Sequence, residues 1–219
     1  MARIAEELLV LLLDNESAQP LLDRNRRGSL LAAALLLDLA HDCRVRPAVA
    51  GDPVPPGHLI ALAGPPARDP AVRPALALLE QGPLTPRAAI ARVRKHAEDD
   101  VLDQLLRTGQ IHQRQLSSHR LRRNTYAWPL SDTRRVGDAR ATIHAVLFEH
   151  RRPDPVTAAV IALLYRCGAL AAVLGFSEDG ARAAATRAEE ITFAGWGPGS
   201  DTGEVNLAMT ASAVLPALN

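Results

Sequence analysis

The sequence predicts a mainly α-helical protein: a single helical domain, residues 1–219, around a buried central helix, with one small β-hairpin and room for a second. The stretch from Leu30 to Leu37 has no polar residue on any side, so a helix there must be surrounded by protein. The chain is 219 residues long and 47% hydrophobic, which is enough for a substantial core. Strand-like runs are short and fall in only two regions.

The central helix is predicted over Ser29–Cys43, which reads SLLAAALLLDLAHDC. A membrane span is the alternative for so apolar a run. Asp38, His41, Asp42 and Arg44 end it well short of the ~20 residues that a bilayer requires, which favours a core helix. A buried Asp38 would be costly unless it capped a neighbouring helix or paired with a base, so we predict that its role is structural.

Upstream, a first helix is predicted over Ala2–Leu13, with Glu6 and Glu7 at the positive end of its dipole. The segment Pro20–Arg27 is expected to be a connection dense in charge. It carries three arginines just ahead of the central helix, which are either a solvated linker or part of an anion site: Arg24, Arg26 and Arg27.

After the central helix, prolines break up the chain, and short strands at Arg44–Ala50 and His58–Ala63 could form a small hairpin. A short helix follows over Ala71–Glu80. One long helix is expected over Pro86–Thr108, with Gly109 as its C′ residue. The first half of this helix is basic and contains Arg87, Arg92, Arg94 and Lys95, whereas its second half opens on Glu98, Asp99 and Asp100.

The region from Arg107 to Arg135 is the strongly basic part of the chain. Within it, the run RRNTYAWPL predicts a β-hairpin that places Tyr126 and Trp128 beside arginines. Aromatic rings beside cations favour the headgroup layer of a membrane, whereas a solvated charged surface is the simpler interpretation. The hairpin residues of interest are Arg120, Arg122, Arg123, Tyr126 and Trp128.

Four helical regions are predicted in the last third of the chain. A helix is expected over Arg140–His150, and the apolar segment Val156–Phe176 is expected to form two helical pieces around a kink near Gly168. Further helices are predicted over Ala181–Phe193 and Val205–Leu218.

Charge and cysteine content narrow the function classes. The formal net charge is only +1, so attraction to phosphate or to a membrane must come from local clustering of arginine. Cys43 and Cys167 stand far apart with no CxxC spacing, and we expect buried thiols in a reducing compartment. The N-terminal sequence lacks the basic n-region of an export signal, so the expected location is cytoplasmic.

No catalytic constellation is recognisable in the sequence. It contains no HExxH motif and no GxSxG elbow. Glu98, Asp99 and Asp100 are consecutive, and consecutive helical residues point in different directions, which favours a solvated face over a metal site. We therefore predict a protein that is not an enzyme, with no cofactor and no metal.

Five blocks occur in an order and spacing that resemble the Golgi phosphoprotein 3 family, including its bacterial members. They are IAEELLVLLLDNES, SLLAAALLLDLAHDCRV, VLDQLLRTGQIHQRQ, the WPL after the basic hairpin, and PDPVTAAVIALLYRCGAL, and together they span nearly the whole chain. The resemblance implies a helical domain around a buried helix, with a β-hairpin on its membrane-facing side. The eukaryotic members bind phosphatidylinositol 4-phosphate at the Golgi surface and hold glycosyltransferase tails, so the resemblance implies binding of that lipid headgroup.

The resemblance assigns the lipid pocket to four positions. The position of the family's tryptophan falls near Leu22 and Asp23, and that of the arginine at the start of the central helix falls at Ala32. On the later helix, Lys95 matches one family arginine in charge, and Glu98 stands where the other is expected. Nearby arginines could compensate for these substitutions.

The sequence thus predicts a peripheral membrane protein that contacts anionic phospholipid headgroups. The headgroup-binding residues are predicted to be Arg24, Arg26, Arg27, Arg92, Arg94 and Lys95, next to the membrane-contact hairpin defined above. Protein clients and a homo-oligomer stay open as further partners.

Two alternatives belong to other function classes. A helix, the run LLRTGQIHQ and a basic hairpin also outline a winged-helix unit that binds nucleic acid, but Glu98, Asp99, Asp100 and Asp103 on the supposed recognition helix disfavour it. A cytosolic protein adaptor or oligomer without lipid is the other alternative, in which the hairpin aromatics would pack on a partner.

Overall fold

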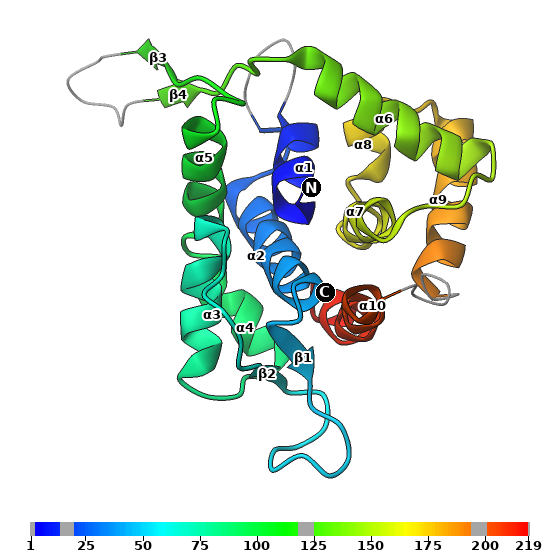
Figure 1. The fold of residues 1–219 in the computed structure, drawn as a ribbon. Helices are drawn as coiled ribbons and strands as arrows, with labels where there is room; N and C mark the ends of the chain where they lie inside the picture. Colours follow the sequence, from blue (N-terminus) through cyan, green and yellow to red (C-terminus); the bar gives the residue numbers. More distant parts are fainter. Residues whose placement is uncertain (1–2, 14–19, 118–124, 194–200, 219) are drawn as a thin grey trace.

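The computed structural model describes residues 3–13, 20–117, 125–193 and 201–218, and over these residues it confirms a mainly α-helical fold. Figure 1 shows helices arranged around α2, with the first helix, α1, beside it. The helices are α1 Ile4–Leu12, α2 Arg24–His41, α3 Arg73–Glu80, α4 Pro86–Val93, α5 Ala97–Arg107, α6 Thr133–Phe148, α7 Pro155–Arg166, α8 Leu170–Leu174, α9 Glu178–Phe193 and α10 Thr202–Val214. Short 3₁₀ turns are η1 Pro70–Val72 and η2 Leu215–Leu218.

Two antiparallel strand pairs complete the described part of the chain. β1 (Val45–Pro47) pairs with β2 (Leu59–Ala61), with Arg46 opposite Ile60. β3 (Arg114–Ser117) pairs with β4 (Thr125–Ala127), and the register shifts between Gln115 and Ser117. Both predicted hairpins are therefore present as strand pairs, and the prediction of a second hairpin is confirmed.

The central helix is buried as predicted. Every residue of α2 from Leu30 to Ala40 is buried, and α2 packs against α1, α4, α5, α7 and α10. Among the described residues, no helix is long and apolar enough to cross a bilayer.

Asp38 has the structural role that the sequence predicted. Its side chain is 3% exposed, and its two carboxylate oxygens accept hydrogen bonds from the backbone N–H groups of Ile4 at 2.9 Å and Ala5 at 3.1 Å. It therefore caps α1 from within α2, and the cap offsets part of the cost of burying the carboxyl group. Burial raises the pKa of Asp38 to about 7, against the opposing effect of the Ala5 and Ile4 hydrogen bonds and the charge of Arg3.

Several predicted helix boundaries were wrong. The helix expected over Arg140–His150 is α6, which begins at Thr133, because Asp132 caps it by accepting a hydrogen bond from the backbone N–H of Arg134. α2 begins at Arg24 rather than near Ser29, because Asp23 caps it by accepting hydrogen bonds from the backbone N–H groups of Asn25 and Arg26. The helix expected over Pro86–Thr108 is two helices, α4 and α5, separated by a turn at residues 94–96.

Other predictions hold with smaller changes. Gly109 has φ +68° after α5, and the N–H of Gln110 donates to the carbonyl oxygen of Leu105 at 2.9 Å, as in a Schellman C-cap. The predicted kink near Gly168 separates α7 from α8. Cys43 and Cys167 are half-buried rather than buried, since both lie at the ends of helices.

Candidate anion-binding site

The first turn of α2 determines which arginines of the predicted site reach the surface. A helix directs successive residues about 100° apart, so neighbouring arginines diverge. Arg24 and Arg26 are exposed, whereas Arg27 is 9% exposed and points into the protein. The arginines that the sequence grouped together therefore have different environments.

Arg27 belongs to a buried ion pair. Its Nε donates to Oε1 of Glu98 at 2.7 Å, its Nη2 lies 2.6 Å from the same oxygen, and its Nη1 donates to the carbonyl oxygen of Leu22. The pair joins the first turn of α2 to the start of α5. Because its charge is neutralised and its donors are engaged, Arg27 holds the site in place, and we assign no headgroup contact to it.

A glycine brings the second basic segment against α2. A β-carbon on Gly28 would lie 2.9 Å from the carbonyl oxygen of Arg94, a backbone atom, so only glycine permits this approach. The contact places the turn after α4 beside the first turn of α2. This turn carries Arg94, Lys95 and His96, all exposed, and Arg92 is exposed in the last turn of α4.

A cavity of about 390 Å³ opens between the first turn of α2, the end of α4 and the end of α7. Three cations line it: Arg26 in α2, Arg94 in the turn after α4 and Arg166 at the end of α7. None of the described residues that line this cavity is acidic. The other lining residues are Asn25, Ser29, Leu30, Cys167 and Leu218. We call this cavity the three-arginine pocket.

The C-terminal end of α7 holds Arg26 in position. Nη2 of Arg26 donates to the carbonyl oxygen of Cys167, the C-cap residue of α7. A cation at the C-terminus of a helix is stabilised by the helix dipole, so this contact stabilises the guanidinium group of Arg26. Burial raises the pKa of the Cys167 thiol, although the charge of Arg26 opposes the shift, so this thiol is not activated as a nucleophile.

The structure brings together only some of the predicted headgroup residues. Arg26 and Arg94 line the three-arginine pocket, whereas Arg24, Arg92 and Lys95 lie exposed on the same two segments outside its lining. The sequence reasoning missed Arg166, because we interpreted it as an interruption of an apolar segment. Arg166 is the last residue of α7, and it lines the same cavity as Arg26 because the two helices pack together. The sequence alone does not show this packing.

Tyr126 and Trp128, the aromatic residues of the hairpin, lie close to the protein body and not at a protruding tip. Trp128 follows β4 and packs against the hydrophobic core, and its ring centroid is 6.1 Å from that of Tyr126. Both side chains are half-buried. Arg120, Arg122 and Arg123 lie outside the described residues, so their membrane contact stays a prediction.

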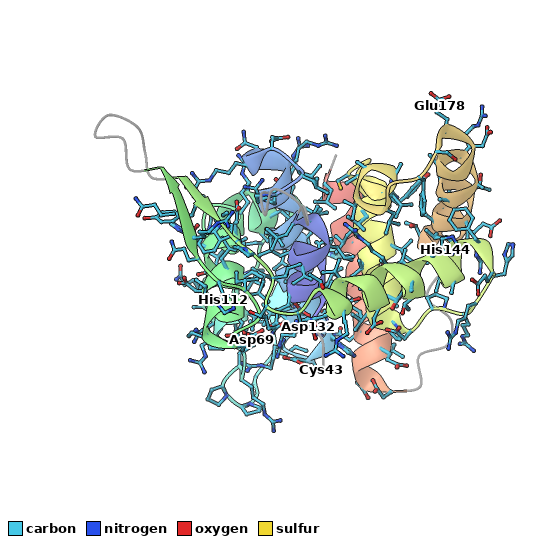
Figure 2. All side chains as sticks on the ribbon, turned by 90° about the horizontal axis from the view of Figure 1, so that it is seen from above. Cys43, Asp69, His112, Asp132, His144 and Glu178 are labelled. Carbon is cyan, nitrogen blue, oxygen red and sulfur yellow. The ribbon has the colours of Figure 1, made fainter. Side chains whose placement is uncertain are left out.

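The β3–β4 pair and the N-terminal end of α2 extend toward the same side of the molecule. In Figure 2, β3, β4 and the N-terminal end of α2 extend toward the top of the view, whereas Cys43 and Asp69, beyond the other end of α2, lie at the bottom. The N-terminal end of α2 carries Arg24 and Arg26 of the predicted headgroup residues.

The positions assigned by resemblance do not form a pocket here. Asp23 is the cap of α2, Ala32 is fully buried, and Glu98 is paired with Arg27. Lys95 alone is an exposed cation among them. In addition, the described residues contain no group of three or more His, Cys, Asp or Glu side chains that could hold a metal ion.

A family model described as Golgi phosphoprotein 3 (GPP34) matches residues 4–208, nearly the whole chain. The chain belongs to the Golgi phosphoprotein 3 (GPP34) family. The match includes every element from α1 into α10, so all residues of the three-arginine pocket except Leu218 lie within the GPP34 region. No curated protein matches the chain.

Proposed function

We propose that this GPP34 protein is a non-enzymatic, cytoplasmic protein that binds the surface of membranes through anionic phospholipid headgroups. Family membership supports the class of function, and phosphatidylinositol 4-phosphate is the headgroup that family resemblance suggests. The observation that carries the proposal is the close approach of two segments that both carry exposed cations, the first turn of α2 and the turn after α4.

The electrostatics of this surface suit an anionic membrane. The whole molecule is close to neutral, with a formal net charge of +1, so a locally basic side orients it toward negative headgroups. Each cation near such a surface contributes about 1 kcal/mol to binding. Arg24, Arg92 and Lys95 together would then contribute on the order of 3 kcal/mol, a factor of roughly one hundred in partition.

Vesicle flotation tests the proposal. Neutral phosphatidylcholine vesicles are compared with vesicles that contain phosphatidylserine or phosphatidylinositol 4-phosphate at matched total charge. We expect recovery on both anionic compositions and none on the neutral one. The double variant Arg24→Gln/Lys95→Gln should lose roughly thirtyfold in partition, because it removes two surface cations, at about 1 kcal/mol each, and leaves the pocket lining intact.

The matched control is Arg151→Gln/Arg152→Gln. These two arginines are also exposed, but they precede α7, at the opposite end of that helix from Arg166. Their loss removes the same charge and should leave vesicle recovery unchanged. Equal recovery on neutral and anionic vesicles, or an equal loss in both double variants, would contradict binding by this surface.

Binding of nucleic acid is a weaker candidate. α5, the helix that would enter a groove in a winged-helix interpretation, exposes Asp99 and Asp103 and keeps Asp100 half-buried. Burial raises the pKa of Asp100, and the neighbouring charges of Asp99 and Asp103 contribute in the same direction. An acidic helix of this kind repels phosphate, so a gel shift on random duplex should show no binding.

A further inference from the structure

We infer that a cavity at the C-terminal end of α2 binds a free amino acid with a cationic side chain, such as lysine, and that Arg68 holds the carboxylate of this ligand. The last turn of α2, the segment 65–68 and the start of α10 line the cavity, and Cys43, labelled in Figure 2, lies in its wall. Its volume of about 640 Å³ falls in the range of about 300–1,000 Å³ that is typical of small-molecule sites. It lies at the opposite end of α2 from Arg24 and Arg26, so the inference does not rest on the proposed function. We call it the α2 C-terminal cavity.

The walls of the α2 C-terminal cavity are fixed relative to one another. A β-carbon on Gly203 would lie 2.5 Å from the carbonyl oxygen of His41, so the start of α10 packs directly on the end of α2. The buried side-chain amide of Asn206 donates to the carbonyl oxygens of Ala40 at 2.6 Å and Val45 at 2.7 Å. These bonds join α10 to α2 and β1. A site that is already in place loses little entropy when a ligand binds.

Two cations in the wall are already compensated within the protein. Nε of Arg3 lies 2.8 Å from Oδ2 of Asp69, and its Nη2 lies 2.9 Å from Oδ2 of Asp42. Arg44 is 7% exposed, and its Nη2 lies 3.6 Å from Oε1 of Glu80. We assign neither guanidinium group to a ligand. Because Arg3 shares one positive charge between two carboxylates, negative charge is left over beside the cavity.

Arg68 is available to a ligand. Its side chain is exposed and lines the cavity, and it has no hydrogen bond or ion pair to the part of the chain that the structure describes. A guanidinium group presents N–H donors in a planar fork that matches the two oxygens of a carboxylate. Arg68 can therefore bind one carboxylate of a ligand in bidentate geometry.

Asp42 and Asp201 make another part of the wall negative. Burial raises the pKa of the Cys43 thiol, and the charges of Asp201 and Asp42 act in the same direction, so both carboxylates lie near this thiol. Asp38 also lines the cavity, but both of its oxygens are occupied by the cap of α1. An ammonium group beside Asp42 and Asp201 would offset their negative charge, and the C-terminal end of α2 also favours a cation.

The balance of charge favours a ligand with more positive than negative groups. Asp38, Asp42 and Asp201 line the cavity, and Arg68 is the cation there that no carboxylate of the described residues compensates. A neutral amino acid brings only one ammonium group, and a diamine brings no carboxylate for Arg68. Lysine brings two ammonium groups and one carboxylate, so it suits both parts of the wall.

Calorimetric titration of the full chain with L-lysine tests the inference against two analogues that each lack one charged group. L-Norleucine lacks the side-chain ammonium group, and cadaverine lacks the carboxylate. We expect heat of binding with L-lysine and affinities at least tenfold lower for both analogues, because loss of a charge-assisted hydrogen bond typically weakens binding on the order of tenfold or more. No heat with L-lysine, or equal affinity for L-lysine and either analogue, would overturn the inference.

Two variants locate the ligand. Arg68→Gln should weaken binding of L-lysine on the order of tenfold or more and leave the affinity for cadaverine unchanged, because cadaverine has no carboxylate. Asp201→Asn should weaken binding of both, and it should still fold, since Asp201 caps α10 and asparagine caps a helix as well as aspartate does. Unchanged affinity for L-lysine in either variant would contradict the inference.

The matched control is Arg151→Gln. Arg151 is also exposed, but it precedes α7 and lies outside the cavity lining. Its loss removes the same charge as Arg68→Gln and should leave the affinity for L-lysine unchanged. An equal loss in Arg151→Gln and Arg68→Gln would show that net charge, and not the α2 C-terminal cavity, governs binding, and would overturn the inference.

Discussion

Gly28 lies directly against the backbone of Arg94: a β-carbon on Gly28 would lie 2.9 Å from the carbonyl oxygen of Arg94. Gly28→Ala should therefore destabilise the protein by about 1–3 kcal/mol, because the clash is with a backbone atom that cannot move alone. This loss exceeds the roughly 1 kcal/mol that alanine normally gains over glycine inside a helix. Urea denaturation gives the free energy of unfolding.

The matched control is Gly137→Ala in α6. Gly137 is also inside a helix, but a β-carbon added there would meet no other atom within 4 Å. That variant should be more stable by about 0.5–1 kcal/mol through helix propensity alone. An equal gain in Gly28→Ala would show that α2 and the turn after α4 can separate without cost.

The effects of substituting Arg27 and Glu98 on the free energy of unfolding should be strongly coupled, because the two side chains form one ion pair. Their side chains are 11% and 15% exposed. Arg27→Met or Glu98→Gln alone should lower the free energy of unfolding by on the order of 2–3 kcal/mol, because each leaves a buried partner unpaired. The double variant should lose less than the sum of the two. A double-mutant cycle from urea denaturation measures the coupling.

Arg182 and Asp179 provide the comparison for this cycle. They form an ion pair three residues apart on α9, with side chains 79% and 89% exposed. The coupling between them should be only about 0.2–0.5 kcal/mol. A coupling for Arg27 and Glu98 no larger than this would mean that the pair does not fix α2 against α5.

The buried central helix and the structural role of Asp38 could be predicted from the sequence. Both follow from the residues of one short stretch. Leu30–Leu37 has no polar face, and Asp38 in such a place needs a cap or a base. The start of α2 was missed because Arg24–Arg27 contains no apolar residue and gives no helical periodicity. The signal that could have found it was Asp23, a favourable N-cap residue.

The pocket was only half predictable. Arg26 and Arg94 were chosen from local clustering of charge, but the sequence offers no reason to separate them from Arg27, whose partner Glu98 is 71 residues away. Arg166 lies 140 residues beyond Arg26, and its place beside the first turn of α2 follows from how α7 packs on α2. Contacts of this kind depend on the packing of whole helices.

Asp38 should make stability depend on pH. The folded state raises its pKa to about 7 from an ordinary value of 3.8, so between these values the folded state binds more protons than the unfolded chain. The contribution of Asp38 to the free energy of unfolding is therefore largest at the acidic end and falls as pH rises toward 7, above which it is constant. Urea denaturation over this pH range measures it.

Asp38→Asn isolates this contribution, because Arg3, Asp42 and Asp69 around it are unchanged. The amide can accept only one of the two backbone N–H groups of α1, so the variant should be less stable by about 1 kcal/mol or more near pH 4. The difference from the unmodified protein should shrink as pH rises. A difference that grows with pH would show that Asp38 is ionised throughout.

Binding to anionic vesicles should fall steeply with salt. The charges of Arg24, Arg92 and Lys95 are exposed, and the screening length falls from about 10 Å at 0.1 M to about 3 Å at 1 M ionic strength. Flotation across this range should show loss of the protein from phosphatidylserine vesicles. Recovery that is independent of salt would point to apolar insertion and away from these cations.

Trp128 should act mainly on stability. Its ring packs against the core at the base of the β3–β4 pair and lies 6.1 Å from the ring of Tyr126. Trp128→Ala should lower the free energy of unfolding by on the order of 2 kcal/mol, less than the 3–5 kcal/mol of a fully buried aromatic, because the side chain is half-buried. Trp128→Phe should lose less, since it keeps most of the apolar contact. Flotation of the folded variants on anionic vesicles should match the unmodified protein. Unchanged stability of Trp128→Ala together with lost flotation would instead make Trp128 a membrane anchor.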